Sequence, residues 1–292
     1  MVVIIIPKVK VGILGTGNVG TDLLVKIQRS GLLECVMFAG IRKDSPGIAR
    51  AKQMGVKTSI QSISAILTSE ARIVFDCTTA KSHLNHAPFL RDRFVIDLTP
   101  SRVGNMCVPL VNLKECLTSG NVNLASCGAQ AIVPLAKVIM EIYPDCEYME
   151  IVSSMSSCSA GMGTRNNIDE FTQTTAKAIE ELTGVKKAKA IIILNPAVPP
   201  VIMQNTLYAK ISNPNIRMLK SRIKQVVKQI QEYVPGYELV VEPTYEKQEN
   251  RVVLVIRCIG RGDYLPKYAG NLDIITANAV KIAEEYAKNK NN

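Results

Sequence analysis

A glycine-rich hexapeptide near the start of the chain constrains the fold more than any other feature. The apolar residues 9–14 (VKVGIL) are followed by Gly15-Thr16-Gly17-Asn18-Val19-Gly20 and then by a helical pattern to about Ser30. Glycines at these positions permit a tight turn, and they let the backbone approach a pyrophosphate that caps the helix. The pattern predicts a dinucleotide-binding unit, with a structural turn in some other α/β protein as the alternative.

Strands and helices alternate over the first 130 residues. Further apolar strands are expected at 35–41, 71–76, 94–98 and 122–126, with a short helix at 44–53. This alternation is typical of a Rossmann-type, doubly wound parallel sheet in an α/β protein. We therefore expect a dinucleotide-binding domain over residues 1–130.

The pattern changes in the second half of the chain. Strands are expected at 147–156, 190–195, 206–211, 238–243 and 251–258, with helices from 168 to Gly184, over 215–234 and at about 272–288. Strands separated by long crossing helices indicate an α+β domain with a mixed sheet. We assign residues 131–269 to this catalytic and dimerisation domain and expect the C-terminal helix, 270–292, to pack back on the first domain.

Charge and composition exclude several classes of protein. The net charge is +10, but Trp is absent and aromatic residues are only 5%, which argues against a nucleic-acid reader and favours a polyphosphate cofactor. No apolar run approaches the roughly 20 residues that span a bilayer. The opening MVVIII is too short for a signal-peptide core and is expected to form an edge strand or an ordered extension. We expect a cytoplasmic protein that binds neither nucleic acid nor a membrane.

The eight cysteines are scattered and form no CxxC motif or His-Cys cluster. Dispersed thiols in an intracellular α/β protein are usually reduced core residues, so neither a disulfide framework nor a metal site is expected.

Cys127 differs from the other cysteines because it stands where an apolar strand turns into a helix, in NVNLASCGAQAIVP. Unpaired N–H groups and the helix dipole at such a position stabilise a thiolate and can hold an oxyanion. A nucleophilic sulfur and a dinucleotide site together indicate oxidation of an aldehyde through a thioester. Both histidines, His83 and His86, precede Cys127; we expect them on a surface helix in a structural role.

Two cations follow the second strand, where an acidic residue would bind the ribose hydroxyls of NAD. Arg42 and Lys43 stand there, and a cation attracts the 2′-phosphate that a carboxylate repels. NADP is therefore expected to be tolerated or preferred, unless both side chains point to solvent.

A second glycine-rich segment opens the helix at 168. It can present N–H groups to a nicotinamide amide or a phosphate, and its arginine favours this function over a simple helix cap by one of its two asparagines. The segment comprises Ser159, Ala160, Gly161, Met162, Gly163, Thr164, Arg165, Asn166 and Asn167.

Several collinear stretches resemble the acylating acetaldehyde dehydrogenases, which work beside 4-hydroxy-2-oxovalerate aldolase in aromatic meta-cleavage pathways. The stretches cover nearly the whole chain: GTGNVGTDL, FDCTTA, IDLTP, CVPLVNL, NVNLASCGAQAIVP, SAGMGTRNNIDEFTQTTAKAIE, KAIIILNPAVPP, YVPGY and YLPKYAGNLDI. The resemblance implies a fold like that of glyceraldehyde-phosphate and semialdehyde dehydrogenases.

The resemblance also implies roles for particular residues. Cys127 would form the acyl-thioester, and Thr16–Val19, the segment 159–167 and Asn271 would surround the nicotinamide. The implied reaction converts acetaldehyde, coenzyme A and NAD(P)+ to acetyl-CoA and NAD(P)H in a homodimer, with acetaldehyde supplied by the aldolase. Asn205 stands where the family carries an aspartate suggested as a base, so Asp169 or Glu170 is a candidate for that role.

Two other functions stay open at this point. A cysteine-dependent semialdehyde or acyl-phosphate reductase would share the fold but use phosphate in place of coenzyme A. A non-catalytic nucleotide-binding subunit of an aldolase complex is the second, motivated by Asn205.

Overall fold

The computed structural model describes residues 7–161, 165 and 168–291, so the extension expected at residues 1–6 lies outside the described residues. The chain divides into two compact units, the first comprising residues 1–109, 113–124 and 276–292 and the second residues 110–112 and 125–275. None of the described helices is long and apolar enough to cross a bilayer.

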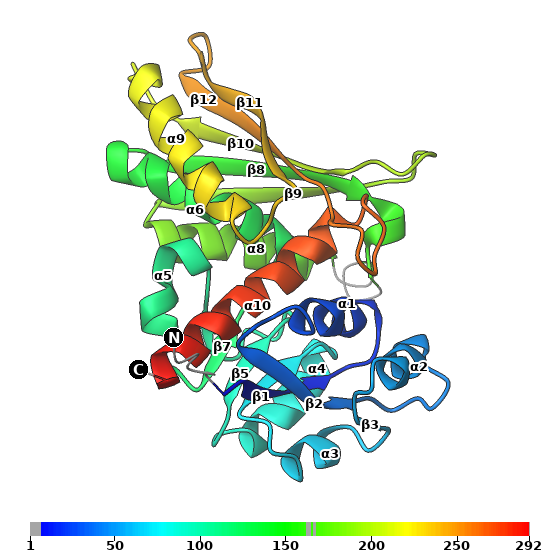
Figure 1. The fold of residues 1–292 in the computed structure, drawn as a ribbon. Coiled ribbons are helices and arrows are strands. Elements are labelled where there is room, and N and C mark those ends of the chain that lie inside the picture. Colours follow the sequence, from blue (N-terminus) through cyan, green and yellow to red (C-terminus); the bar gives the residue numbers. More distant parts are fainter. Residues whose placement is uncertain (1–6, 162–164, 166–167, 292) are drawn as a thin grey trace, which may run out of the picture. The chain divides into compact units, whose positions relative to one another are not determined.

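The first unit contains a seven-stranded sheet in the order β3-β2-β1-β4-β5-β7-β6 (Figure 1). All of its strand pairs are parallel. The chain leaves β1 in one direction for β2 and in the other for β4, and ligands of such sheets bind at the carboxyl ends of the strands where the order reverses. The strands are β1 (Val9–Leu14), β2 (Leu33–Ala39), β3 (Thr58–Ser59), β4 (Ile73–Asp76), β5 (Phe94–Asp97), β6 (Asn105–Met106) and β7 (Asn121–Asn123).

Helices cover this sheet and the C-terminal helix is anchored to it. Within the first unit, Thr276 donates a 2.6 Å hydrogen bond to the buried Asp22, and the ring of Tyr286 stacks on Phe94 at 4.1 Å. The helices are α1 (Asn18–Ile27), α2 (Pro46–Gln53), α3 (Ile63–Leu67), α4 (Ala80–His86), α5 (Pro109–Cys116) and α10 (Gly270–Asn291), whose residues from Thr276 onward belong to this unit.

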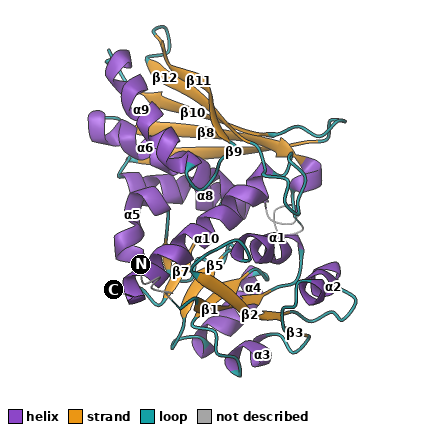
Figure 2. Cartoon of the chain, viewed as in Figure 1, coloured by secondary structure: helices purple, strands orange, loops and turns teal. Residues whose placement is uncertain are grey.

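The second unit is a five-stranded mixed sheet with the order β11-β12-β10-β8-β9 (Figure 2). β8 and β9 are parallel and the other pairs are antiparallel. Helix α6 lies beside α8 and α9 and contacts the central strands. The strands are β8 (Tyr148–Ser156), β9 (Lys187–Asn195), β10 (Met203–Lys210), β11 (Tyr237–Glu246) and β12 (Arg251–Cys258); the helices are α6 (Cys127–Ile142), α8 (Ile168–Thr183) and α9 (Ile216–Gln231).

Only one face of this second sheet is fully buried. Alternate residues of β8, such as Met149 and Ile151, are buried, while their neighbours Glu150 and Val152 are only half-buried. Strand β10 shows the same alternation. A period of two with one solvated face is expected for a sheet whose helices pack on one side.

The predicted fold class is confirmed: a Rossmann-type parallel sheet is followed by a mixed-sheet unit. The expected elements differ from the observed ones mainly at their ends; the strand expected at 206–211, for example, is Met203–Lys210. The boundary between the two compact units lies between Leu124 and Ala125, whereas the sequence analysis places it at residue 130. The second boundary lies within α10, before Thr276, whereas the sequence analysis places it after residue 269.

A Gly20→Ala substitution should destabilise the first unit, because a Cβ at Gly20 would lie 1.9 Å from the carbonyl oxygen of Gly15. Removing such a clash requires backbone movement, and we expect about 2–4 kcal/mol of destabilisation, measured by thermal and urea unfolding. Gly17→Ala is the matched control, since a Cβ there meets nothing within 4 Å. Equal stability of the two variants would contradict this account of the turn.

Candidate active site

The glycine loop of the first unit forms an open helix N-terminus. Gly15 has φ of +102°, in the left-handed region, and its Cβ would lie 2.6 Å from the carbonyl oxygen of Cys77. Helix α1 begins after Gly17, which provides no side-chain cap and around which a Cβ would meet open space. First-turn N–H groups have no intrahelical acceptor, so this loop can bind a phosphate.

The turn after β2 packs on the same loop. Ser45 donates a 2.8 Å hydrogen bond to the carbonyl oxygen of Thr16, and a Cβ at Gly40 would lie 2.6 Å from Thr16 Oγ1. Arg42 and Lys43 are both exposed at this turn, and Arg42 pairs with Asp44, with 3.2 Å between Nη2 and Oδ2. The Arg42 guanidinium therefore lies at the turn that packs on the nucleotide loop, but its charge is partly offset by the ion pair with Asp44.

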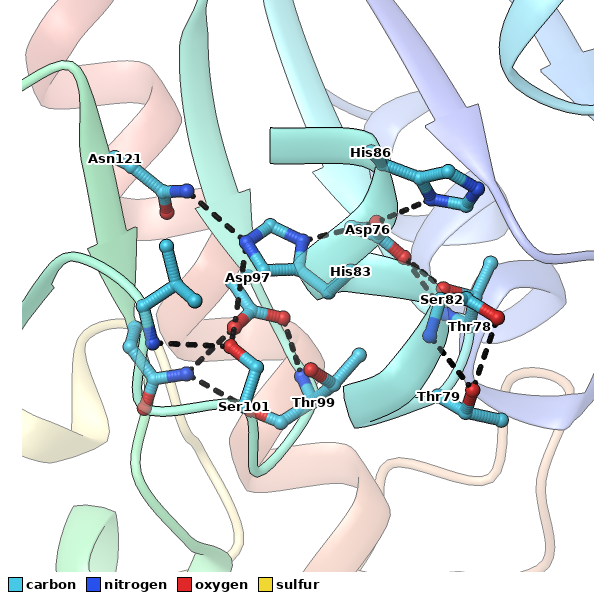
Figure 3. Close-up of polar contacts among 12 residues, drawn as sticks. Asp76, Thr78, Thr79, Ser82, His83, His86, Asp97, Thr99, Ser101 and Asn121 are labelled. Carbon is cyan, nitrogen blue, oxygen red and sulfur yellow. Dashed lines mark hydrogen bonds and ion pairs between the residues drawn. The ribbon is translucent and has the colours of Figure 1, made fainter. Parts of the chain in front are cut away.

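Two buried carboxylates end neighbouring strands at the carboxyl edge of this sheet. Leu14, Asp76, Asp97 and Asn123 are aligned across β1, β4, β5 and β7, and Asp76 and Asp97 have no exposed surface. His83 of α4 bonds to Asp76 through Nδ1 at 3.0 Å (Figure 3).

The expectation that His83 lies on a surface helix is wrong, since the side chain is fully buried. His86 is nearly buried and also bonds to Asp76 at 3.0 Å. The signal in the sequence was the pair of apolar strands IVFD and FVID, which both end in aspartate. The sequence of α4 by itself does not indicate that these two carboxylates pack against the helix.

The residues at this edge fit a dinucleotide. The glycine loop provides a cradle that side chains would fill, and Thr99 Oγ1, in the loop after β5, is buried without a hydrogen-bond partner among the described residues. Buried hydroxyls normally have partners, so an unmatched one at a ligand-binding edge is suited to a polar ligand group.

Cys127 is the first residue of α6 in the second unit. Ser126 caps the helix by accepting a 3.0 Å hydrogen bond from the N–H of Ala129, and its hydroxyl lies 2.6 Å from that of Thr175. Cys127 is buried, with 9% of the residue exposed. This capping fixes the direction of the first turn of α6, and the sulfur lies at the N-terminal start of that turn.

Burial raises the pKa of the Cys127 thiol to about 12, against the opposing effect of hydrogen bonds from the N–H groups of Gly128 and Cys127 itself. The sequence predicted the helix end and its N–H donors, but not that desolvation outweighs them. The thiol is therefore protonated at neutral pH, and the two donors are available to a negative charge that develops at the sulfur or on a bound oxygen.

Neutral polar groups surround the first turn of α6. A Cβ at Gly128 would lie 3.0 Å from Ser153 Oγ, and this hydroxyl donates a 2.6 Å hydrogen bond to Asn205 Oδ1. Asn205 is fully buried, and its Nδ2 has no partner among the described residues. The alternative base candidates, Asp169 and Glu170, lie in the first turn of α8.

The second glycine segment is described only in part. Asn271 Nδ2 donates a 3.2 Å hydrogen bond to the carbonyl oxygen of Ser159, so two predicted cofactor residues meet within the second unit. Arg165 bonds through Nε to the carbonyl oxygen of Ala160 at 3.1 Å and through Nη2 to that of Ser157, so it also stabilises the loop backbone. Gly161 is exposed. The predicted residues Met162, Gly163, Thr164, Asn166 and Asn167 lie outside the described residues.

Comparisons with known proteins agree on one family. Residues 127–266 match the family model "Prokaryotic acetaldehyde dehydrogenase, dimerisation". The chain is 48% identical to acetaldehyde dehydrogenase of Pectobacterium atrosepticum, over 95% of both chains, and 49% identical to that of Geobacillus stearothermophilus, over 97% of both. The relative from Brevibacillus brevis is 50% identical over 96% of each chain.

The fold is also similar to a crystal structure of aspartate semialdehyde dehydrogenase II from Vibrio cholerae complexed with ASA. The TM-score is 0.62 at 15% sequence identity, over 95% of this chain and 98% of that one. At this identity the likeness concerns the fold alone.

Alkylation of Cys127 should be slow at neutral pH and should accelerate about tenfold per pH unit from pH 7 to 10, because only the thiolate reacts and its pKa is raised to about 12. Iodoacetamide labelling of the ligand-free chain, with peptide mapping by mass spectrometry, measures this. The exposed Cys158 is the internal control. A Cys127 that reacts at pH 7 as fast as Cys158 would show that burial does not control its ionisation.

Proposed function

Because the chain belongs to the acetaldehyde dehydrogenase family, we propose that it oxidises acetaldehyde through a thioester on Cys127 and transfers the acetyl group to coenzyme A. The observation that carries the proposal is the position of Cys127 at the capped N-terminus of α6, with two backbone N–H groups directed at its sulfur. The reverse reaction, reduction of an acyl-CoA, uses the same groups.

The Cys127 sulfur forms a bond to the aldehyde carbon while the C=O π bond breaks toward oxygen and the thiol proton passes to a water molecule, which gives a tetrahedral hemithioacetal oxyanion. The first-turn N–H groups of α6 are suited to stabilise this charge, an interaction typically worth about 3–4 kcal/mol in acyl-transfer enzymes. The neutral pair Ser153–Asn205 borders this turn, and the buried Asn205 Nδ2 can donate a hydrogen bond to a polar group of the bound substrate. An amide cannot accept the thiol proton, so Asn205 orients and does not act as a base.

NAD(P) binding is expected from the Rossmann-type unit of this dehydrogenase family, and the bound nicotinamide supplies the hydride acceptor. Residues of the glycine loop, Gly15–Gly20, would hold the pyrophosphate at the N-terminus of α1. Ser159 and Arg165 of the second glycine segment, together with Asn271, would contribute to the nicotinamide part of the site. The coenzyme A sulfur then forms a bond to the thioester carbon, the bond from that carbon to Cys127 breaks, and the proton of the coenzyme A thiol passes to the departing Cys127 sulfur.

A homodimer is part of the proposal, because the matched family model is named for dimerisation and covers the second unit. The half-exposed face of the mixed sheet carries apolar side chains that a second copy would bury. They are Val152, Ile191, Ile193, Val241 and Val253.

We further propose that an aldolase supplies the acetaldehyde in the cytoplasm, as the resemblance implies.

The acyl-enzyme should be trapped by mass spectrometry after acetaldehyde and NAD are mixed with the chain without coenzyme A. We expect an added acetyl group on the peptide that contains Cys127, and its loss when coenzyme A is added. Cys127→Ser should reduce turnover by about 10³-fold or more, since a serine without a base is a weak nucleophile. Cys158→Ser is the matched control. Release by phosphate but not by coenzyme A would favour an acyl-phosphate reductase instead.

Arg42→Asp should weaken NADP binding about tenfold or more while changing NAD affinity less, because it replaces a cation at the ribose end of the site by a carboxylate. Titration of both cofactors against both proteins measures the ratio. Lys52→Asp, in the last turn of the helix α2 that follows the Arg42 turn, controls for general charge. Unchanged NADP affinity of the Arg42 variant would mean that its side chain does not reach the cofactor.

A further inference from the structure

His83 lies between two buried carboxylates that end neighbouring strands. Its Nδ1 is 3.0 Å from Asp76 Oδ2, and its Nε2 is 3.6 Å from Asp97 Oδ2 and 3.0 Å from Asn121 Nδ2. Figure 3 shows the ring held between Asp76 on one side and Asn121 and Asp97 on the other. The side chains of His83 and of both carboxylates are completely buried.

The hydrogen-bond pattern around the ring requires a proton on Nδ1, because an ionised carboxylate only accepts. The protonation of Nε2 then decides the charge. An unprotonated Nε2 would direct its lone pair toward the nearby Asp97 carboxylate, while Asn121 Oδ1 stays buried with no partner among the described residues. A proton on Nε2 faces the Asp97 carboxylate favourably, and a rotated Asn121 amide lets Oδ1 accept from it, although this rotation leaves Nδ2 in the buried position that Oδ1 held and removes the hydrogen bond from Nδ2 to a neutral ring.

Both carboxylates are surrounded by donors, which favours their ionised forms. Asp76 Oδ1 accepts from the N–H and the hydroxyl of Thr78, and Asp97 accepts from Thr99 N, Ser101 Oγ and Asn123 Nδ2. Two buried negative charges are costly unless a cation lies between them.

The pKa directions of His83 and Asp76 agree with the geometry, whereas the direction for Asp97 opposes it. Burial favours neutral His83, but its hydrogen bond to Asp76 and the charge of Asp97 outweigh burial and raise its pKa. Burial likewise opposes ionisation of Asp76, yet hydrogen bonds from His83, His86 and Thr78 hold its pKa well below the usual range. Burial raises the pKa of Asp97, against the charge of His83. Burial and both carboxylates raise the pKa of Cys77, so that thiol stays neutral.

The loops that this cluster joins border the glycine loop. Thr78 binds Asp76 in the β4–α4 loop, and the preceding residue, Cys77, donates a 2.7 Å hydrogen bond to Leu14 and places its carbonyl oxygen against Gly15. Thr99 and Ser101 bind Asp97 in the loop after β5. A change in the charge between Asp76 and Asp97 therefore acts on the backbone that shapes the dinucleotide cradle.

We propose that His83 is a positioning residue for the dinucleotide site, present as an imidazolium that links Asp76 to Asp97 and holds the loops after β4 and β5 against the glycine loop. The imidazolium also offsets the negative charge of two carboxylates at the edge that receives a pyrophosphate. The cofactor part of this inference rests on the proposed function. The charge state of His83 does not.

The charge state can be measured directly, because the untagged chain contains only two histidines. We expect ¹⁵N-histidine spectra of the ligand-free wild type at pH 7.5 to show one ring with both nitrogens protonated. His86→Gln leaves a single ring and assigns that signal to His83. A neutral ring for His83 at this pH would overturn the proposal without the need for any cofactor.

The positioning role is tested by NAD affinity between pH 6 and 9. A group whose pKa is raised on folding stabilises the protein fully below its unfolded pKa and loses this effect as pH rises through the folded value. Loss of the His83 proton also removes the positive charge that offsets two carboxylates at the edge proposed to receive the pyrophosphate, so wild-type NAD affinity should fall as well. His83→Gln should bind NAD about tenfold more weakly at pH 6.5, as expected for loss of a charged hydrogen bond, and should lose most of this pH dependence.

Two comparisons separate positioning from a general loss of structure. His86→Gln removes a second imidazole from Asp76 but keeps the link to Asp97, so its NAD affinity should keep the wild-type pH profile. Asp97→Asn removes one carboxylate and should move the profile of His83 to lower pH. Identical NAD affinity of His83→Gln and wild type at every pH would overturn the positioning role. If wild type binds no dinucleotide, the proposed function and the positioning role both fail, while the ring spectrum still decides the imidazolium.

Discussion

The chemistry of this chain depends on the desolvation of one sulfur atom. Burial moves the pKa of Cys127 from 9.0 to about 12, which corresponds to about 4 kcal/mol against forming the thiolate at the usual 1.36 kcal/mol per unit. The two N–H groups at the start of α6 oppose this cost without removing it. The sulfur of the ligand-free chain therefore stays a thiol, and in the proposed mechanism the same donors then stabilise the oxyanion. Such an arrangement protects a reactive cysteine from solvent oxidants, because the thiolate is the reactive form.

Local patterns predicted those parts of the structure that local interactions build. The strand–glycine–helix sequence at 9–30 and the helix that starts at Cys127 each depend on neighbouring residues, and both were placed within a few positions. The strand ends were less accurate, as at β9, which starts at Lys187 and not at residue 190. Pairing with β8 extends this strand through polar residues that have no apolar signal of their own.

The environment of each site residue could not be predicted in the same way, because it comes from distant parts of the chain. The polar groups beside the first turn of α6 come from three other elements. They are Ser153 of β8, Asn205 of β10 and Thr175 of α8. His83 meets Asp97 and Asn121 from strands that lie 14 and 38 positions further along. A polar helix with two histidines looks solvated in the sequence, whereas burial is decided by strand order. The two aspartates at matching strand ends were the available clue.

The buried polar side chains of the two units differ in charge, and this difference agrees with the ligands that we propose for each unit. At the edge of the parallel sheet, ionised carboxylates are kept in the interior and balanced by histidine, so that a cradle of backbone N–H groups stays attractive to an anion. The side chains beside the first turn of α6 are neutral and hydrogen-bond to one another. Ser126 bonds to Thr175, and Ser153 bonds to the amide of Asn205. A carboxylate beside that buried thiol would raise its pKa still further, since like charges disfavour ionisation. A neutral Asn205, compared with an aspartate at this position, thus favours the thiolate electrostatically, although it cannot remove the proton.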